Sequence, residues 1–297
     1  MRIKKENYFM ESCIITIEFV QNIIERRSRE IHKGDCGRVL VVAGSSGMAG
    51  AAVLACKGAL RSGSGLVQAV LPENLFPVVQ IGIPEATCLE RDFSKIDLGR
   101  YDAAAVGPGL GEGKESVEAV IHIIKNFDGP IVLDADGLNI TAHNDLFDLL
   151  RKRTSGTTVI TPHIGEARRL LGREIGILQE ERIDAAAALA EKTGAVTVLK
   201  GHKTVVATVG GKTYINTTGN PGMATAGCGD VLTGIITGLM GQKKSCGRRM
   251  SAKEAALCGV FLHGMAGDLA ADKIGEYGLI AGDIADYTAY ALKQISG

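Results

Sequence analysis

The sequence lacks an excess of either charge, paired cysteines and long apolar runs. Its 33 basic and 33 acidic residues cancel, which argues against nucleic acid as the main partner. The seven cysteines include no Cys-x-x-Cys pair, so neither a disulfide framework nor a zinc site is expected, and a reducing cytoplasm is the simpler location. No apolar run reaches the roughly 18 residues that span a bilayer, so no membrane partner is expected.

The N-terminus also lacks the apolar core and the small-residue cleavage site of a secretory signal. Residues 12–33 instead have an amphipathic pattern, with Val20, Ile23 and Ile24 on one face and charged side chains on the other. The start of the chain, residues 1–30, is therefore predicted to be a helical lead-in.

Short apolar runs alternate with helical patterns along the rest of the chain. The pattern predicts strands at 38–43, 66–70, 103–106, 130–133, 158–160 and 196–199, and helices at 51–62, 114–126, 165–171 and 180–192. Two further runs, 204–208 and 213–216, flank Gly210-Gly211 and predict a hairpin, and helices follow at 231–240, 252–271 and 281–295. We therefore expect an α/β fold with a mostly parallel sheet flanked by helices, and residues 1–297 as a single domain.

Glycine and polar residues gather where the predicted strands end. Five such loops cover 44–50, 107–111, 134–139, 161–166 and 200–204. In an open parallel sheet, ligands bind beyond the carboxyl ends of the strands, so the loops predict one extended cleft. The first two loops could line a substrate or serve as ordinary turns.

The most informative loop runs from Asn216 into an apolar helical pattern and contains Asp230. Its residues Ala226, Gly227, Cys228 and Gly229 allow backbone amides to turn toward an anion, and the following helix directs its positive end to the same point. Asp230 is the predicted catalytic base that takes a proton from a hydroxyl. Two alternatives are a helix N-cap carboxylate at Asp230 and a cysteine nucleophile at Cys228, with His163 as its base.

Four further candidates have both a functional and a structural interpretation. Asp134, beside Asp136, could bind Mg²⁺ or cap a turn, and Glu166 could hold metal-bound water or cap a helix. His163 could contact a ligand or be structural. The run Lys200, Gly201, His202, Lys203 and Thr204 suits the phosphate and ribose of a nucleotide, or forms a solvated turn.

These motifs together resemble a known family. Asn220-Pro221-Gly222-Met223-Ala224 and Gly227-Cys228-Gly229-Asp230 resemble the anion-hole motif of the ribokinase-like fold. With Gly44–Gly50 and Ala51, Gly107-Pro108-Gly109, Thr161-Pro162-His163-x-Gly-Glu166 and Lys200-Gly201, in this order, they resemble the ADP-dependent NAD(P)H-hydrate dehydratases over about residues 31–295. Position 228 is more usually Thr in that family, and Cys228 offers a weaker hydrogen bond.

The resemblance implies a three-layer ribokinase-like fold and ADP-dependent dehydration of the S epimer of NADHX or NADPHX, the hydrated cofactors, with Mg²⁺. It implies that Ala51, Gly109, His163 and Asp230 contact the hydrate, that Lys200–Thr204 and Gly229 contact AMP, and that Ala226–Gly229 form the anion hole. Asp134 and Glu166 are the expected magnesium ligands. A homotetramer is expected, with the NAD(P)HX epimerase as a separate protein.

Two other functions fit the same loops. A vitamin-precursor kinase of this fold would use Asp230 in the same role but would release a stable phosphorylated substrate. A nucleotide sensor would bind without turnover. The sequence leaves open the choice between ADP and ATP, and between NADHX and NADPHX.

Overall fold

The computed structural model describes residues 12–297. In that range, ten strands form one sheet in the order β1-β10-β9-β8-β7-β6-β5-β2-β3-β4. Neighbours are parallel except around β9, which is antiparallel to both β8 and β10. The strands are β1 (Cys13–Ile15), β2 (Arg38–Val42), β3 (Leu66–Leu71), β4 (Thr87–Glu90), β5 (Ala103–Val106), β6 (Ile131–Leu133), β7 (Thr158–Ile160), β8 (Val196–Leu199), β9 (Val205–Ala207) and β10 (Thr213–Asn216).

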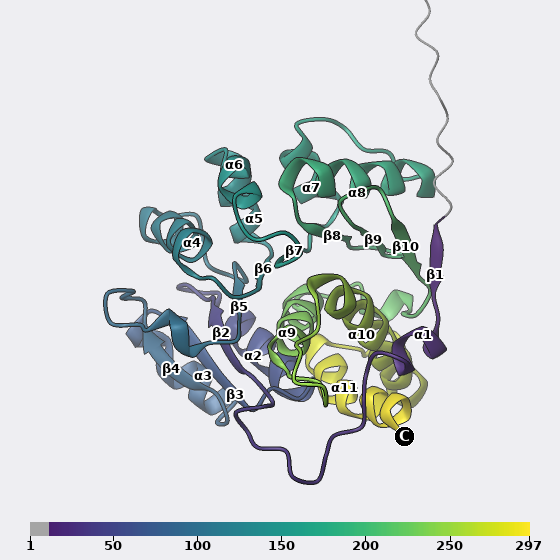
Figure 1. The fold of residues 1–297 in the computed structure, drawn as a ribbon, viewed down its shortest axis with the longest axis horizontal. Helices are drawn as coiled ribbons and strands as arrows, with labels where there is room; N and C mark the ends of the chain where they lie inside the picture. The colour runs from purple at the N-terminus through teal and green to yellow at the C-terminus, as the bar shows by residue number, and fades with distance from the viewer. Residues whose placement is uncertain (1–11) are drawn as a thin grey trace, which may run out of the picture.

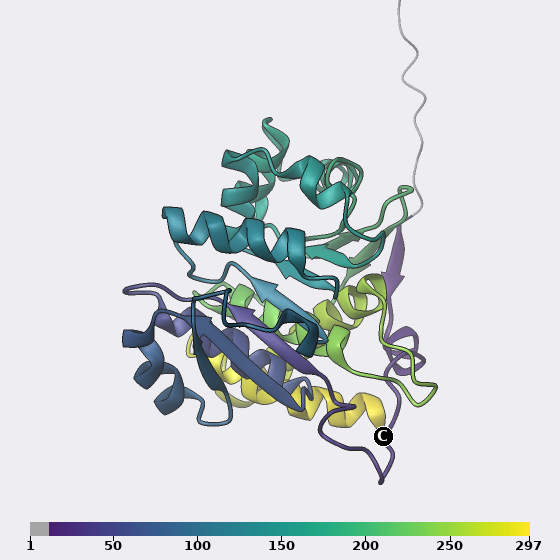
Figure 2. The same ribbon diagram turned by 60° about the vertical axis from the view of Figure 1, so that its left-hand side comes forward.

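Helices cover both faces of this sheet (Figure 1). Helices α4 to α8 lie over one face, and α2, α3, α9, α10 and α11 lie over the other, which gives three layers (Figure 2). The helices are α1 (Ile17–Gln21), α2 (Ala49–Arg61), α3 (Phe76–Gly82), α4 (Lys114–Asn126), α5 (Asp136–His143), α6 (Phe147–Arg151), α7 (Ile164–Leu171), α8 (Gln179–Thr193), α9 (Cys228–Gly241), α10 (Ala252–Ile274) and α11 (Ala281–Ser296). Among the described residues, no helix combines the length and apolarity that a membrane span requires.

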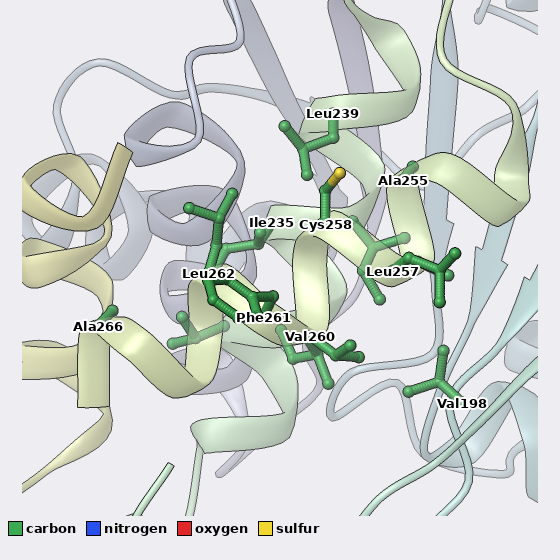
Figure 3. Packing of buried hydrophobic residues seen from close by; sticks show 14 of the residues in the cluster. Val198, Ile235, Leu239, Ala255, Leu257, Cys258, Val260, Phe261, Leu262 and Ala266 are labelled. Atoms are coloured by element: carbon green, nitrogen blue, oxygen red, sulfur yellow. The ribbon is translucent and has the colours of Figure 1, made fainter. Parts of the chain in front are cut away.

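The strands are apolar on both sides because both sides are covered. In β2, Val39 and Val41 pack with α2, whereas Leu40 and Val42 pack in the core under α4 to α8. The third apolar cluster surrounds α9 and α10. Figure 3 shows side chains of α9 and α10 packed against one another, with Val198 of β8 at one side of the cluster. This packing fixes the start of α9 against the carboxyl ends of the central strands.

The sequence pattern locates most of these elements, and the α/β class is confirmed. The helical lead-in is wrong where the structure describes it. Residues 13–15 form β1, which pairs with β10, and only Ile17–Gln21 is helical before an irregular segment. The apolar side chains of Val20 and Ile24 are buried in the core, although the segment does not form a long helix. Residues 1–11 lie outside the described part of the chain.

Candidate functional site

The glycine and polar loops meet at one edge of the sheet, as expected for loops that follow the carboxyl ends of parallel strands. The Gly44 amide donates to the Pro108 carbonyl at 2.9 Å, which joins the first two loops. The Gly111 amide donates to Asp136 at 2.7 Å, and the Lys200 amide donates to the Pro162 carbonyl at 2.8 Å. Loops that are far apart in sequence are therefore tied together in pairs along this edge.

Ala51 and Gly109, two predicted substrate contacts, are close neighbours. Gly109 has a φ of +56°, and a Cβ added there would lie 2.8 Å from both the Ala51 Cβ and the Met48 carbonyl oxygen. The close approach requires glycine, because any side chain would strain the backbone and clash with α2. The structure thus places the two residues side by side at the start of α2.

The loop ahead of Asp230 ends at the start of α9, which has no side-chain cap. Gly227 occupies the N-cap of α9 with a φ of +91°, and a glycine has no side chain with which to cap the helix. Asp230 lies in the first turn, not at the N-cap, so the N-cap interpretation of this carboxylate is wrong. Amides and helix dipole therefore meet in front of Asp230, as an anion site requires.

Asp230 is partly buried, and its environment favours the protonated form. Burial raises the pKa of its carboxyl to about 7, and the nearby charge of Asp134 adds to that rise, while Lys200 opposes it. A carboxylate with a pKa near neutrality is suited to accept and release a proton at physiological pH.

Cys228 faces the protein interior. Its side chain belongs to the apolar cluster of α9 and α10, and burial raises the pKa of the thiol to about 11. A buried thiol with a raised pKa stays protonated at neutral pH. The structure therefore opposes the cysteine-nucleophile alternative.

His163 and Glu166 form a capping box at the start of α7. The His163 Nδ1 accepts from the amides of Gly165 and Glu166 at 2.9 and 3.3 Å, and the Glu166 carboxylate accepts from the His163 amide at 2.8 Å. Burial lowers the pKa of the imidazole, and the charge of Lys200 lowers it further. The histidine is thus a neutral cap whose side chain stays 53% exposed, and a ligand contact there stays a prediction.

Asp134 and Glu166, the predicted Mg²⁺ ligands, both lie close to the ammonium of Lys200. The Lys200 Nζ lies 2.5 Å from Asp134 Oδ1 and 4.0 Å from Glu166 Oε2. The Thr233 hydroxyl donates to the other Asp134 oxygen at 2.7 Å. Across residues 12–297, no group of three or more His, Cys, Asp or Glu side chains is arranged to hold a metal. With an ammonium already between the carboxylates, this donor set does not fit a protein-held Mg²⁺.

Side chains of α8 hold the predicted nucleotide loop, residues 200–204, through hydrogen bonds to its backbone. The Arg182 guanidinium donates to the His202 carbonyl, and Gln179 Nε2 donates to the Lys203 carbonyl at 3.2 Å. The side chains of His202 and Lys203 are exposed. Because the supporting bonds use backbone carbonyls, these side chains are available to a ligand.

Some residues that shape the site gave no signal in the sequence. His263 and Asp268 lie within the apolar pattern of α10 and look like ordinary helix positions. His263 Nε2 lies 3.0 Å from the Cys228 carbonyl, and Asp268 accepts from the Gly219 amide at 2.8 Å. Burial lowers the pKa of His263 to about 4, so the ring is neutral and donates. Only tertiary packing reveals that α10 holds the glycine loop.

Comparisons with known proteins agree with this geometry. The family model described as NAD(P)H-hydrate dehydratase matches residues 39–289. An ADP-dependent (S)-NAD(P)H-hydrate dehydratase from Neisseria meningitidis is 38% identical, with 93% of this chain and 91% of that protein covered. A bifunctional NAD(P)H-hydrate repair enzyme from Moorella thermoacetica is 40% identical over 95% of this chain.

The chain spans about half the length of the first curated relatives it matches, 54% in the Moorella protein. A solved structure of the Bacillus subtilis ADP/ATP-dependent NAD(P)H-hydrate dehydratase, co-crystallised with ATP/Mg²⁺, superposes with a TM-score of 0.82 at 34% identity. It covers 96% of this chain and 99% of that one, and the three-layer fold is the ribokinase-like fold. The chain belongs to the NAD(P)H-hydrate dehydratase family.

Proposed function

We propose that this protein repairs hydrated nicotinamide cofactor by ADP-dependent dehydration of the S epimer of NADHX or NADPHX. The observation that carries the proposal is the placement of Asp230, partly buried in the first turn of α9 beside the amides of Ala226–Gly229. A single base next to an anion site suits transfer of a phosphoryl group to a hydroxyl. Family membership identifies that hydroxyl as the one that water has added to the dihydropyridine ring.

The reaction has two stages. Asp230 takes the proton as the hydrate oxygen attacks the terminal phosphorus of ADP, and the bond from that phosphorus to AMP breaks. The ring nitrogen lone pair then expels phosphate from carbon 6, and loss of the proton at carbon 5 restores the double bond. The products are NAD(P)H, AMP and phosphate. Phosphorylation is needed because hydroxide is a poor leaving group.

The other site residues divide between the two substrates in this proposal. Ala51, Gly109 and His163 contact the hydrate together with Asp230. Support comes from the adjacency of Ala51 and Gly109. The loop Lys200–Thr204 and Gly229 contact the nucleotide, supported by the exposed side chains of His202 and Lys203.

Magnesium enters the proposal with the nucleotide. The Bacillus relative was co-crystallised with ATP/Mg²⁺, and Mg²⁺ in such sites is bound largely by phosphate oxygens and water. We therefore do not assign Asp134 or Glu166 as metal ligands, because their carboxylate oxygens lie close to the Lys200 ammonium.

The deciding experiment incubates the purified protein with NADHX, ADP and Mg²⁺ and follows the absorbance of the reduced nicotinamide. We expect the absorbance to recover with the release of AMP and phosphate. A stable phosphorylated product would instead support the kinase, and nucleotide binding without turnover would support the sensor.

The variant Asp230→Asn tests the role of the carboxylate. It should bind ADP but lose at least roughly 100-fold in rate, the low end for a lost general base. The exposed carboxylate of Asp145, in the turn after α5, offers a matched control, because Asp145→Asn should keep the wild-type rate. Wild-type turnover by Asp230→Asn would remove this residue from the mechanism.

We propose a cytoplasmic homotetramer, which light scattering would test as a mass four times the 31.2 kDa of one chain. An NAD(P)HX epimerase is its functional partner, because an enzyme specific for the S epimer leaves the R epimer unrepaired. Addition of an epimerase should therefore bring repair of a mixed hydrate to completion.

A further inference from the structure

Lys200 is a fixed cation inside the site. Its side chain is 19% exposed, and its carboxylate neighbours Asp134 and Glu166 are only 1% and 5% exposed. Burial works against the charge, but the attraction of Asp134 and Glu166 outweighs it and raises the pKa of the ammonium. The lysine therefore holds a permanent positive charge in one position, where water screens it little.

The Lys200 ammonium lies close to the first turn of α9. A Cβ added to Gly229 would be 3.2 Å from Lys200 Nζ and 3.7 Å from Asp134 Oδ2. Gly229 belongs to the first helical turn, whose amides form the predicted anion hole. The cation and the positive end of a 14-residue helix thus act on the same small volume.

Asp134 holds both the Lys200 ammonium and helix α9 in place. One of its oxygens binds Lys200, and the other accepts from Thr233, which is fully buried on α9. Thr233 follows Asp230 by three residues, so both lie on neighbouring turns of one helix face. A single buried carboxylate therefore sets the distance between the lysine at the end of β8 and the helix that carries Asp230.

We propose that Lys200 contacts the terminal phosphoryl group of ADP, and that Asp134 is the residue that positions it. The inference rests on the proposed function and deepens it. It differs from the expectation that Lys200 serves the AMP portion, since the exposed side chains of the same loop, His202 and Lys203, are left for that part. It also replaces the assignment of Asp134 and Glu166 as metal ligands.

The test compares the affinities for ADP and AMP by calorimetry, with no hydrate present. The variant Lys200→Met should weaken ADP binding about tenfold or more, the effect expected for a lost charge-assisted hydrogen bond, while AMP binding changes little. Lys200→Arg keeps the charge and should retain part of the preference for ADP. Equal losses for ADP and AMP would overturn the inference, because Lys200 would then serve a group that both nucleotides share.

The variant Asp134→Asn tests positioning against metal binding. It should reduce the preference for ADP over AMP, and the effect of added Mg²⁺ on ADP affinity should persist. Loss of that magnesium effect would return Asp134 to the role of metal ligand. Unchanged AMP affinity serves as the check on folding, and if Asp134→Asn does not fold, the two Lys200 variants still decide.

Failure of this inference and failure of the proposed function are separable. Binding of ADP and AMP is measured without NADHX, so the Lys200 result stands even if the wild-type protein does not convert NADHX to NADH. Conversely, full repair activity with equal losses of ADP and AMP affinity in Lys200→Met would keep the function and remove Lys200 from the terminal phosphate.

Discussion

Burial and neighbouring charges all affect the pKa of the Asp230 carboxyl group. Burial raises its pKa to about 7, the neighbouring carboxylates add to the rise, and Lys200 counteracts it. Because the proposed base works only when ionised, kcat/KM should increase as the pH rises through about 7 and level off above it. A pH–rate profile measures this, and a profile that is flat between pH 5 and 8 would contradict it. The residual rate of Asp230→Asn should lack the rise.

The same raised pKa affects stability with a defined sign. An aspartate that holds its proton more tightly when folded stabilises the fold fully below its unfolded pKa of 3.8, and that stabilisation is lost as the pH rises through about 7. Replacing it with asparagine should therefore raise the free energy of unfolding at pH 8 by up to about 4 kcal/mol, and by little near pH 4. Thermal unfolding of both proteins at the two pH values would show it.

At the scale of single residues, the sequence reveals functional groups better than it reveals their partners. Acids, bases and cations at strand ends suggest chemistry, and five residues stand out in this way: Asp134, His163, Glu166, Lys200 and Asp230. The sequence does not reveal that Lys200 lies between two carboxylates, because Lys200 and Asp134 are 66 positions apart. Such pairings depend on strand order, which no local pattern reports.

The helices α2 and α9 come together through glycines. A Cβ on Gly58 of α2 would overlap the Val231 carbonyl oxygen, and one on Gly234 of α9 would overlap the Ala55 carbonyl oxygen. Backbone is in contact with backbone at both places, so neither neighbour can rotate away. This contact fixes the turn of α9 that carries Asp230.

The variant Gly58→Ala should therefore destabilise the protein by at least about 2 kcal/mol, as an overpacked core does, and should lower the rate by displacing α9. Gly50→Ala, on the same helix with open space at its Cβ, is the matched control. It should be neutral or stabilising by up to about 1 kcal/mol, because alanine favours a helix over glycine. Chemical denaturation compares the two, and equal stabilities would show that α2 and α9 adjust freely.

The elements that the sequence does not reveal have weak or misleading local signals. Strand β4 is an edge strand with partly exposed side chains, and α5 begins with Asp136-Gly137, which is typical of a turn. The predicted lead-in helix failed because Ile14 and Ile15 lie in a strand that pairs with β10. Buried runs such as 103–106 were located correctly, since coverage on both faces leaves a continuous apolar signal.

For the whole molecule, the ten strands of residues 12–297 share one hydrogen-bonded sheet. We predict from this continuity that the chain is one domain and unfolds in a single cooperative transition. Far-ultraviolet circular dichroism and tyrosine fluorescence should report the same midpoint in urea. Two separated midpoints would indicate two domains.

The separation between Asp134 and its partners has a consequence for folding. Its bonds to Lys200 and Thr233 join positions 66 and 99 residues apart, so loop-closure entropy delays them relative to local helices. A chain that has not closed these contacts does not yet hold Lys200 against the start of α9, so the nucleotide of the proposed function has its binding residues in place only in the native state. Under the proposed function, ADP that binds the native state stabilises it by mass action, so saturating ADP should slow both unfolding and proteolysis.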